Sequence, residues 1–299
     1  PPRSTLFPYT TLFRSDEGLD QVEALMPALL TCAERLINPI KIDPKTREAA
    51  QSMPIETVTA AQLTADAAQF GLAGSPTWVQ EVRAQESPKV HCTMIDAADP
   101  ELAAERVIAA LESRGALKPR VHRRRPIAAP IRPPARGKDV WVAVETDLSG
   151  AITLGSLELL SAADRLATQL GGAVIATGLS ADLARHAGLI ASYGADRIVI
   201  PASPALASYS PDSAAAAIAH LVRDRAPWGL LLCASERGRD WGPRLAARMG
   251  LGLTGDAIGL ELDGENRMVA LKPAFGGNIV APILSKTSPQ AATVRQGVL

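Results

Sequence analysis

The second half of the chain alternates between short apolar runs and longer stretches in which apolar residues return every three or four positions. Residues 140–144 and 228–233 are short apolar runs, a pattern typical of strands buried on both faces of a parallel sheet. The stretch 159–170 carries an apolar stripe at helical spacing. Repeated strand–helix units with right-handed crossovers predict a doubly wound, mostly parallel α/β sheet of the Rossmann-like kind.

The expected elements of this half follow one another from residue 140 onward. Strands are predicted at 140–144, 173–177, 197–200 and 228–233, and closing strands at 256–262, 268–274 and 279–284. Helices are predicted around 159–170, over 181–193, from Pro211 to about 222, and up to 249. Ser210 and Gly250 suit a helix start and a helix end. Gly276 and Gly277 predict a tight hairpin turn, with a phosphate cradle as the alternative.

The polar segment that follows the strand at 228–233 is the main candidate for a binding site. It contains a glycine that lets the backbone turn and present free N–H groups where the next helix begins. Ligands of open α/β sheets lie outside the carboxyl ends of the strands, so a phosphate or a partner would fit here. The candidate cofactor-binding residues are Ser235, Arg237, Gly238, Arg239 and Asp240. A purely structural turn, or a contact with a neighbouring domain, is the alternative.

Three strings stand in order in this half: SERGRDWGPRLAARMGLGLTGD, KPAFGGNIVAPIL and SPQAATVRQGVL. Together with VWVAVE and SLELLSAADRLA upstream, they resemble the N-terminal domain of the electron transfer flavoprotein alpha subunit over about residues 139–299. The sequence departs from the family pattern at Ala291 and Gln296, where Met and Pro are usual. Neither change touches a chemical group.

This resemblance implies an adenine-nucleotide-hydrolase-like fold and an electron carrier rather than an enzyme with its own catalytic residues. Members of the family carry FAD, chiefly in a domain that follows this one, and in some cases AMP. They pass electrons from flavin dehydrogenases, acyl-CoA dehydrogenases or similar enzymes, to a quinone-linked acceptor. The implied partners are a complementary flavoprotein subunit or domain and a flavin dehydrogenase.

Residues 16–117 resemble the C-terminal part of the beta subunit of the same family. The strings are GLDQVEALMPALLT, ERLINP, MPIETV, GSPTWVQEV and DPELAAERVIAAL. We expect a strand within 22–30, a loop over 31–44, a short helix at 46–53 and extended pieces at 54–59 and 79–82, which make an incomplete α/β unit. Asp99 and Pro100 predict a helix that ends at Gly115. In the resemblance, the dehydrogenase-docking lysines are replaced here by AAQSM, and the residues that hold AMP lie upstream.

Two segments stand apart in composition. Residues 118–138 hold eight Lys or Arg, five prolines and no acid, which predicts an extended linker that binds the acidic surfaces of the two domains. A nucleic-acid contact through Arg123, Arg124 and Arg125 is the alternative, but there are no aromatic residues between them to stack on bases. Residues 4–15 have no period that suits a helix or strand, so residues 1–15 are expected to be a foreign or disordered tail.

The remaining composition narrows the class of protein. No apolar run approaches the roughly 18 residues that span a bilayer. Cys32, Cys92 and Cys233 form no CxxC pair, which favours a cytoplasmic location over disulfides or zinc. The four histidines, at positions 91, 122, 186 and 220, are scattered, and no nucleophile or metal-ligand spacing is found.

The sequence therefore predicts a truncated fusion of a beta-subunit part with an alpha-subunit N-terminal domain of electron transfer flavoprotein. The rival hypothesis, from another class, is a non-redox adenine-nucleotide-binding or scaffold module on the same sheet.

Overall fold

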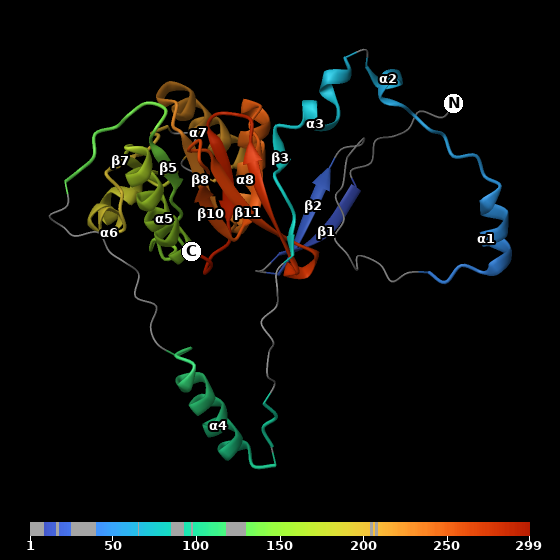
Figure 1. Cartoon of the computed structure of the whole chain (residues 1–299), viewed down its shortest axis with the longest axis horizontal. Helices are drawn as coiled ribbons and strands as arrows, with labels where there is room; N and C mark the ends of the chain where they lie inside the picture. The colour runs from blue at the N-terminus through green and yellow to red at the C-terminus, as the bar shows by residue number, and fades with distance from the viewer. Residues whose placement is uncertain are drawn as a thin grey trace. The chain divides into compact units, whose positions relative to one another are not determined.

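The computed structural model describes residues 9–15, 18–24, 40–64, 66–84, 93–96, 98–117, 130–203, 206 and 209–299. The chain divides into two compact units, Pro1–Leu63 and Thr64–Leu299. Figure 1 shows the whole chain coloured from its N-terminus to its C-terminus.

The described residues of the first unit form a two-stranded hairpin and two helices. Strand β1 (Tyr9–Ser15) pairs antiparallel with β2 (Gly18–Ala24), so the expectation of no strand before residue 16 is wrong for β1. The sequence YTTLFRS is rich in aromatic and β-branched residues, which favour a strand although polar and apolar positions do not alternate regularly. Strand β1 forms by pairing with β2. The expected strand within 22–30 overlaps β2 at its first residues, and residues 25–39 lie outside the described residues.

Helix α1 (Pro44–Gln51) confirms the short helix predicted at 46–53, and it starts two residues earlier. Asp43 caps it, because its carboxylate accepts from the backbone N–H groups of Lys45 at 2.9 Å and Thr46 at 3.2 Å. Pro44 therefore belongs to the first turn rather than to a loop. Helix α2 (Ala60–Leu63) closes the described part of this unit.

The second unit is built on a six-stranded sheet in which all neighbouring strands run parallel. Its order is β7-β6-β5-β8-β13-β9. The strands are β5 (Val140–Ala143), β6 (Val174–Thr177), β7 (Arg197–Val199), β8 (Gly229–Cys233), β9 (Leu253–Ala257) and β13 (Gln290–Val294). The predicted doubly wound parallel sheet is confirmed. Strand β13, which inserts between β8 and β9, is not foreseen from the sequence.

Helices cover both faces of this sheet. Helix α5 (Leu154–Leu170), the 3-10 segment η2 (Ala181–His186) and helix α6 (Ala187–Ser192) contribute to one hydrophobic cluster. Helices α7 (Pro211–Arg225) and α8 (Glu236–Met249) contribute to the other. Within β5, Val142 faces the first cluster and Trp141 the second. This double burial explains why β5 reads as a continuous apolar run.

Polar side chains fix the ends of these helices. Ser210 caps α7, and Gly250 adopts the left-handed conformation (φ 65°) that ends α8, as the sequence predicts. The helix predicted over 181–193 is instead a 3-10 segment followed by the short α6, so that prediction is wrong in type for its first half. Gly194 follows it with φ 113°.

The predicted closing strands form a separate antiparallel sheet of order β10-β11-β12-β3. Its strands are β10 (Gly259–Leu262), β11 (Met268–Ala274), β12 (Ile279–Ser285) and β3 (Thr77–Val79), and the short β4 (Arg83–Ala84) also pairs with β12. The continuous strand expected at 256–262 is instead divided between the two sheets. Strand β9 ends at Ala257 in the parallel sheet, and β10 begins at Gly259 in the antiparallel sheet. The hairpin turn at Gly276 and Gly277 is confirmed as η4 (Phe275–Gly277) between β11 and β12.

Three short elements flank β3 and β4 in the sequence: two precede β3, and one lies between β4 and β5. The 3-10 turn η1 (Ala67–Gln69) and helix α3 (Gly71–Gly74) precede β3. Helix α4 (Pro100–Ser113) confirms the predicted helix and its Asp99 cap, whose carboxylate accepts from the N–H of Glu101 at 3.1 Å. Its apolar stripe, however, is exposed. No strand forms at 54–59. The strand expected at 79–82 is wrong beyond its first residue, because β3 ends at Val79 and residues 80–82 lie between β3 and β4.

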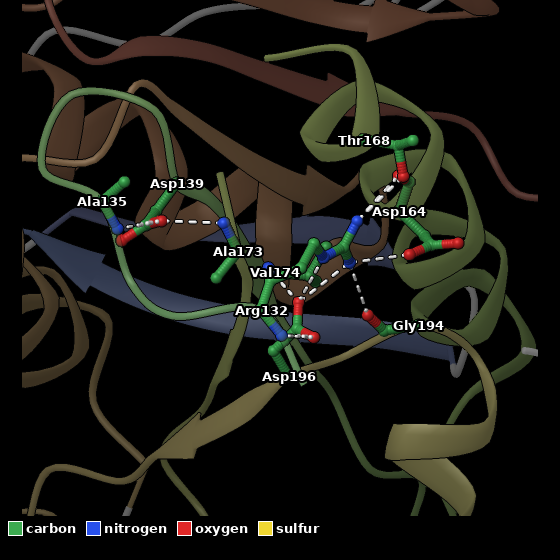
Figure 2. A network of polar contacts seen from close by, with 9 residues as sticks. All are labelled: Arg132, Ala135, Asp139, Asp164, Thr168, Ala173, Val174, Gly194 and Asp196. Atoms are coloured by element: carbon green, nitrogen blue, oxygen red, sulfur yellow. Dashed lines mark hydrogen bonds and ion pairs between the residues drawn. The ribbon is translucent and has the colours of Figure 1, made fainter. Parts of the chain in front are cut away.

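The last part of the basic segment, residues 130–138, belongs to the second unit and packs beside its parallel sheet. Figure 2 shows Arg132 at the centre of its contacts: the guanidinium pairs with Asp196 at 2.8 Å and with Asp164 at 2.7 Å. Asp139 Oδ1 accepts from the backbone N–H groups of Ala135 at 2.8 Å and Ala173 at 2.9 Å. The predicted contact of this segment with acidic side chains is confirmed for Arg132. Arg123, Arg124 and Arg125 lie outside the described residues.

Candidate functional site

A cavity of about 230 Å³ lies at the carboxyl ends of β5 and β6 and beside the first turn of α8. Its apolar lining includes Ala143, Ile218 and Trp241, and its polar lining includes Glu145 and Arg237. In the sheet, β6 and β7 lie on one side of β5, and β8, the next strand in the sequence, lies on the other side of β5. The cavity therefore borders the point where the strand order reverses, which is the usual place for a ligand in an open α/β sheet.

Glu145 and Ser235 bridge this reversal point. The hydroxyl of Ser235, which follows β8, donates to Glu145 Oε1 at 2.9 Å, and Glu145 follows β5. The backbone N–H of Glu145 donates to Ser156 Oγ at 2.9 Å, which fixes the chain after β5. Burial raises the pKa of the Glu145 carboxyl, while the Ser235 hydrogen bond and the charge of Arg237 oppose the rise.

Ser235 is the N-cap of α8 rather than the start of a loop. Its Oγ accepts from the N–H of Gly238 at 2.9 Å, so one hydroxyl caps the helix and also donates to Glu145. The expectation that Ser235 to Asp240 forms a loop is wrong, because α8 begins at Glu236. Gly238 lacks a side chain for a packing reason: a Cβ there would lie far inside contact distance of the Cys233 carbonyl oxygen.

Arg237 lies in the cavity lining with Tyr209. Its guanidinium is 5.4 Å from the centre of the Tyr209 ring, and Nη1 donates to the carbonyl of Thr146 at 3.4 Å. Burial, with a contribution from Asp240, raises the pKa of Tyr209 to about 12. The Arg237 guanidinium, the Tyr209 ring and the apolar side chains of the lining together suit a ligand that has both a flat apolar part and an anionic part.

Arg239 and Asp240 make contacts within the unit instead. Arg239 binds Asp256 through two hydrogen bonds of 3.0 and 3.1 Å, and it is outside the lining of the cavity. Asp240 accepts from the Arg244 guanidinium and from the Tyr209 hydroxyl at 3.4 Å. The five residues named from the sequence are thus spread around the first turns of α8, and only Arg237 among them lines the cavity.

Sequence analysis missed Glu145 and Tyr209. Glu145 ends the string VWVAVE, and a carboxylate directly after a buried strand is a signal that was present in the sequence. Tyr209 lies just before α7, where no local pattern marks it.

The cysteine and histidines among the described residues, Cys233, His186 and His220, are outside the lining of the cavity. Cys233 is buried 3.7 Å from Ser156 Oγ, and burial raises the pKa of its thiol to about 12, so it is a poor nucleophile. Nε2 of His186 is 2.8 Å from the Gly150 carbonyl oxygen, and His220 is exposed on α7. Cys32, Cys92, His91 and His122 lie outside the described residues.

Among the residues that the structure describes, no group of three or more His, Cys, Asp or Glu side chains could hold a metal ion. None of the helices in this part of the chain has the length and apolar character needed to span a membrane.

Comparison with known families matches residues 140–299 to the electron transfer flavoprotein domain. The chain belongs to the electron transfer flavoprotein family. The alpha subunit of the electron transfer flavoprotein from Clostridium acetobutylicum is 42% identical over 163 residues, which are 54% of this chain and 48% of that protein. The matched residues are those that form the parallel sheet, β10 to β12 and the cavity.

Two further relatives of this electron transfer flavoprotein chain have other names. Protein FixB of Rhizobium meliloti is 35% identical over 167 residues, 54% of this chain and 47% of FixB. Subunit LctC of a lactate dehydrogenase (NAD(+),ferredoxin) from Acetobacterium woodii is 33% identical over 164 residues, 54% of this chain and 38% of LctC. The chain spans about half the length of the first two relatives and less of LctC.

The family is named for a flavin, so the fit of FAD to the described residues can be examined. Sites that enclose drug-sized ligands have volumes of about 300–1,000 Å³. The cavity at Glu145 and Arg237 has about 230 Å³, and FAD is a dinucleotide. This cavity is therefore too small to enclose FAD by itself.

Proposed function

We propose that this chain is part of an electron carrier, whose whole protein binds FAD and passes electrons from a flavin dehydrogenase to a quinone-linked acceptor. The family match over residues 140–299 supports this proposal most strongly. In such a protein the redox chemistry belongs to the cofactor, and the chain supplies binding, orientation and electrostatics. The proposed role is thus an electron carrier and not an enzyme with its own catalytic residues. We place the protein in the cytoplasm, since its three cysteines are widely spaced in the sequence.

We further propose that the chain joins parts of two subunits. Residues 139–299 correspond to the N-terminal domain of an alpha subunit, residues 16–117 to part of a beta subunit, and residues 118–138 to the connection. The strings GSPTWVQEV and DPELAAERVIAAL support the beta-type origin of the first part. In this proposal residues 1–15 are not part of either subunit.

FAD in this proposal binds chiefly to the part of the relatives that the chain does not match. The described residues contribute the domain built on the parallel sheet, and its outer helices and loops would contact the neighbouring domains. The proposed partners are a complementary flavoprotein subunit or domain and a flavin dehydrogenase. Ile40 and Ile42, exposed just before α1, are an apolar contact available to such a dehydrogenase.

Complementation tests this function. The 299-residue chain is coexpressed with the half of the Clostridium acetobutylicum alpha subunit that it does not match, and the purified product is scanned for the visible absorption of flavin. We expect a complex with a flavin band that bleaches when the electron donor is added. A complex without flavin, or no complex, would contradict the proposal.

The cavity favours a second function, the binding of AMP or a similar adenine nucleotide. Glu145 can accept from ribose hydroxyls, as acidic residues do in dinucleotide-binding sheets. Arg237 and the N-terminus of α8 provide positive charge for a phosphate. This site would hold a nucleotide without redox chemistry.

Titration calorimetry of the 299-residue chain with AMP distinguishes this second function. We expect Arg237→Ala to weaken AMP binding about tenfold or more, because a charge-assisted contact is lost. Arg239→Ala is the matched control, since Arg239 pairs with Asp256 outside the cavity. Equal losses in both variants would assign AMP to another surface, and no heat with the wild type would remove the second function.

A further inference from the structure

A second cavity lies at the opposite edge of the parallel sheet from the cavity at Glu145. It has about 560 Å³, against about 230 Å³ for the cavity at Glu145. Asp139 precedes β5 and Arg197 is the first residue of β7, so these two lining residues place the cavity at the amino ends of the strands. Its volume is within the range of about 300–1,000 Å³ that is usual for sites of small ligands.

The base of this second cavity is apolar. Trp141 and Ile175 line it and are buried in the hydrophobic cluster to which α7 contributes. Ile198 and Val199 also line it, and they are only partly buried because they belong to β7, the edge strand of the sheet. A ligand in the cavity can therefore bury apolar surface against β7.

One wall of the cavity comes from the basic segment, through Pro134 and Arg136. The N–H of Gly137 donates to the Ala226 carbonyl at 2.9 Å, and Arg136 Nη1 donates to the Asp224 carbonyl at 2.8 Å. Both carbonyls lie at the C-terminal end of α7. The wall is thus fixed to α7 by hydrogen bonds of the chain itself.

The same wall is held to the sheet on its other side. Figure 2 shows Arg132 paired with Asp196, and Asp139 accepting from the N–H of Ala135 at 2.8 Å. These residues precede residue 140, where the match to the family domain begins, apart from Asp196. The wall therefore lies outside the matched domain, and the cavity has its shape before any ligand binds.

Three arginines and two aspartates supply the charge of the lining: Arg136, Arg197, Arg225, Asp139 and Asp224. Asp139 Oδ1 accepts from two backbone N–H groups, and Asp224 accepts from Nε of Arg225 at 2.7 Å, so both carboxylates have donors. Arg197 is exposed, and its guanidinium has no ion pair with another described residue. The lining therefore has an excess of positive charge and donors that are available to an anion.

We propose that this second cavity binds a small ligand that has an apolar body and one oxyanion group, a carboxylate or a phosphate. Guanidinium groups bind both of these oxyanions through paired, charge-assisted hydrogen bonds. The oxyanion lies beside Arg197 and Arg225, and the apolar body lies against Ile198 and Val199. The inference does not depend on AMP, on FAD or on electron transfer, because the cavity at Glu145 is at the other end of the strands.

Titration calorimetry of the 299-residue chain tests this site with four probes. Phenyl phosphate and benzoate carry both parts of the proposed ligand, whereas inorganic phosphate carries only the oxyanion and benzyl alcohol only the apolar ring. We expect saturable binding of phenyl phosphate or benzoate, and weaker binding of the two probes that have one part. The tighter of phenyl phosphate and benzoate identifies the oxyanion.

Variants assign the binding to this cavity. Arg197→Gln and Arg225→Gln should each weaken it about fivefold or more, because each removes a charge-assisted contact that water partly screens. Arg223→Gln is the matched control, since it makes the same change of charge on α7 but lies outside the lining. Arg237→Gln, which changes the cavity at Glu145, should leave this binding as in the wild type.

Four results would overturn the proposal. The first is a wild-type chain that binds neither phenyl phosphate nor benzoate in a saturable way. Equal losses in Arg197→Gln and Arg223→Gln would show that the general charge near the end of α7 attracts the probe. A loss in Arg237→Gln without one in Arg197→Gln would assign the probe to the cavity at Glu145. Inorganic phosphate that binds as tightly as phenyl phosphate would show that the apolar base takes no part.

Discussion

Replacing Arg132 by alanine tests whether one residue of the basic segment anchors that segment to the second unit. The Asp196 side chain has no exposed surface, and it is surrounded by donors. One carboxylate oxygen accepts from the backbone N–H of Arg132 at 2.9 Å. The other accepts from Nε of Arg132 and from the N–H of Val174, both at 2.9 Å. Arg132→Ala removes the cation and leaves the backbone donors of residue 132 and Val174 in place.

The magnitude follows from what remains around Asp196. Removing one partner of a buried ion pair costs about 3–5 kcal/mol when the other charge is left without compensation. Here two backbone N–H groups stay in place, and the Arg132 side chain is 21% exposed, so water reaches part of the site. The contacts of Arg132 with Asp164 and Thr168 are also lost. We expect a decrease of about 2–4 kcal/mol in the free energy of unfolding of the second unit.

Urea unfolding of the full chain, followed by tryptophan fluorescence, measures this change, since Trp141 is buried in the parallel sheet. Arg136→Ala is the control: its guanidinium donates to the Asp224 carbonyl at 2.8 Å on an exposed surface, and we expect less than about 1 kcal/mol. Arg132→Lys is expected to restore only part of the loss, because a single ammonium group cannot reproduce the fork of contacts.

A double variant separates the ion pair from the loss of packing. If Arg132 acts through Asp196, then Arg132→Ala combined with Asp196→Asn costs less than the sum of the two single changes. Arg132→Ala within about 0.5 kcal/mol of the wild type would refute the reasoning, since that is the range of ordinary surface substitutions. It would show that residues 130–138 lie on the unit without stabilising it.

Three further predictions concern the cavity and the family cofactor. Burial raises the pKa of Glu145 above its ordinary value of 4.5, so the folded state binds the proton more tightly and the wild type loses stability as the pH rises. In urea titrations, Glu145→Gln should therefore gain stability relative to the wild type as the pH rises above 4.5, whereas the exposed Glu261→Gln should not; parallel pH profiles for all three proteins would contradict this cause. Gly238→Ala should destabilise the second unit by about 3 kcal/mol, because its Cβ overlaps the Cys233 carbonyl, while Gly264→Ala should cost less than about 0.5 kcal/mol; equal costs would show that the helix start yields without strain. The purified chain, dialysed against FAD and freed of excess ligand, should show no stoichiometric flavin band, and such a band would mean that its residues do form a complete site.

The main sheet could be predicted because its strands are buried on both faces. Strand β8 is a continuous run of large apolar residues, which few other structures tolerate. Strand β13 has the sequence QAATV, which is short and alanine-rich, and it becomes a strand because β8 and β9 pair with it on both sides. That stabilisation is tertiary, so no local propensity reveals it.

The candidate site was only partly predictable for a related reason. The segment after β8 was located from the rule that ligands lie at the carboxyl ends of strands, and Arg237 does line a cavity there. The glycine that suggested a turn is instead a helical residue that lets the backbone approach Cys233. Glu145 lies 90 residues away from its partner Ser235, and only the strand order that places β5 beside β8 brings them together.

The basic segment shows how composition can misplace a boundary. Prolines and like charges indicate an extended linker over residues 118–138, and the family match begins at residue 140. Yet Arg132 fills the space beside Asp196, an acid that lies 64 residues further along the chain. A unit that began at residue 139 would contain Asp196 and Asp164 without the cation that neutralises them. Asp139 would also lose the N–H of Ala135, one of the two donors to its Oδ1. Because buried carboxylates require such partners, the folding unit extends upstream at least to Arg132, beyond the start of the family domain.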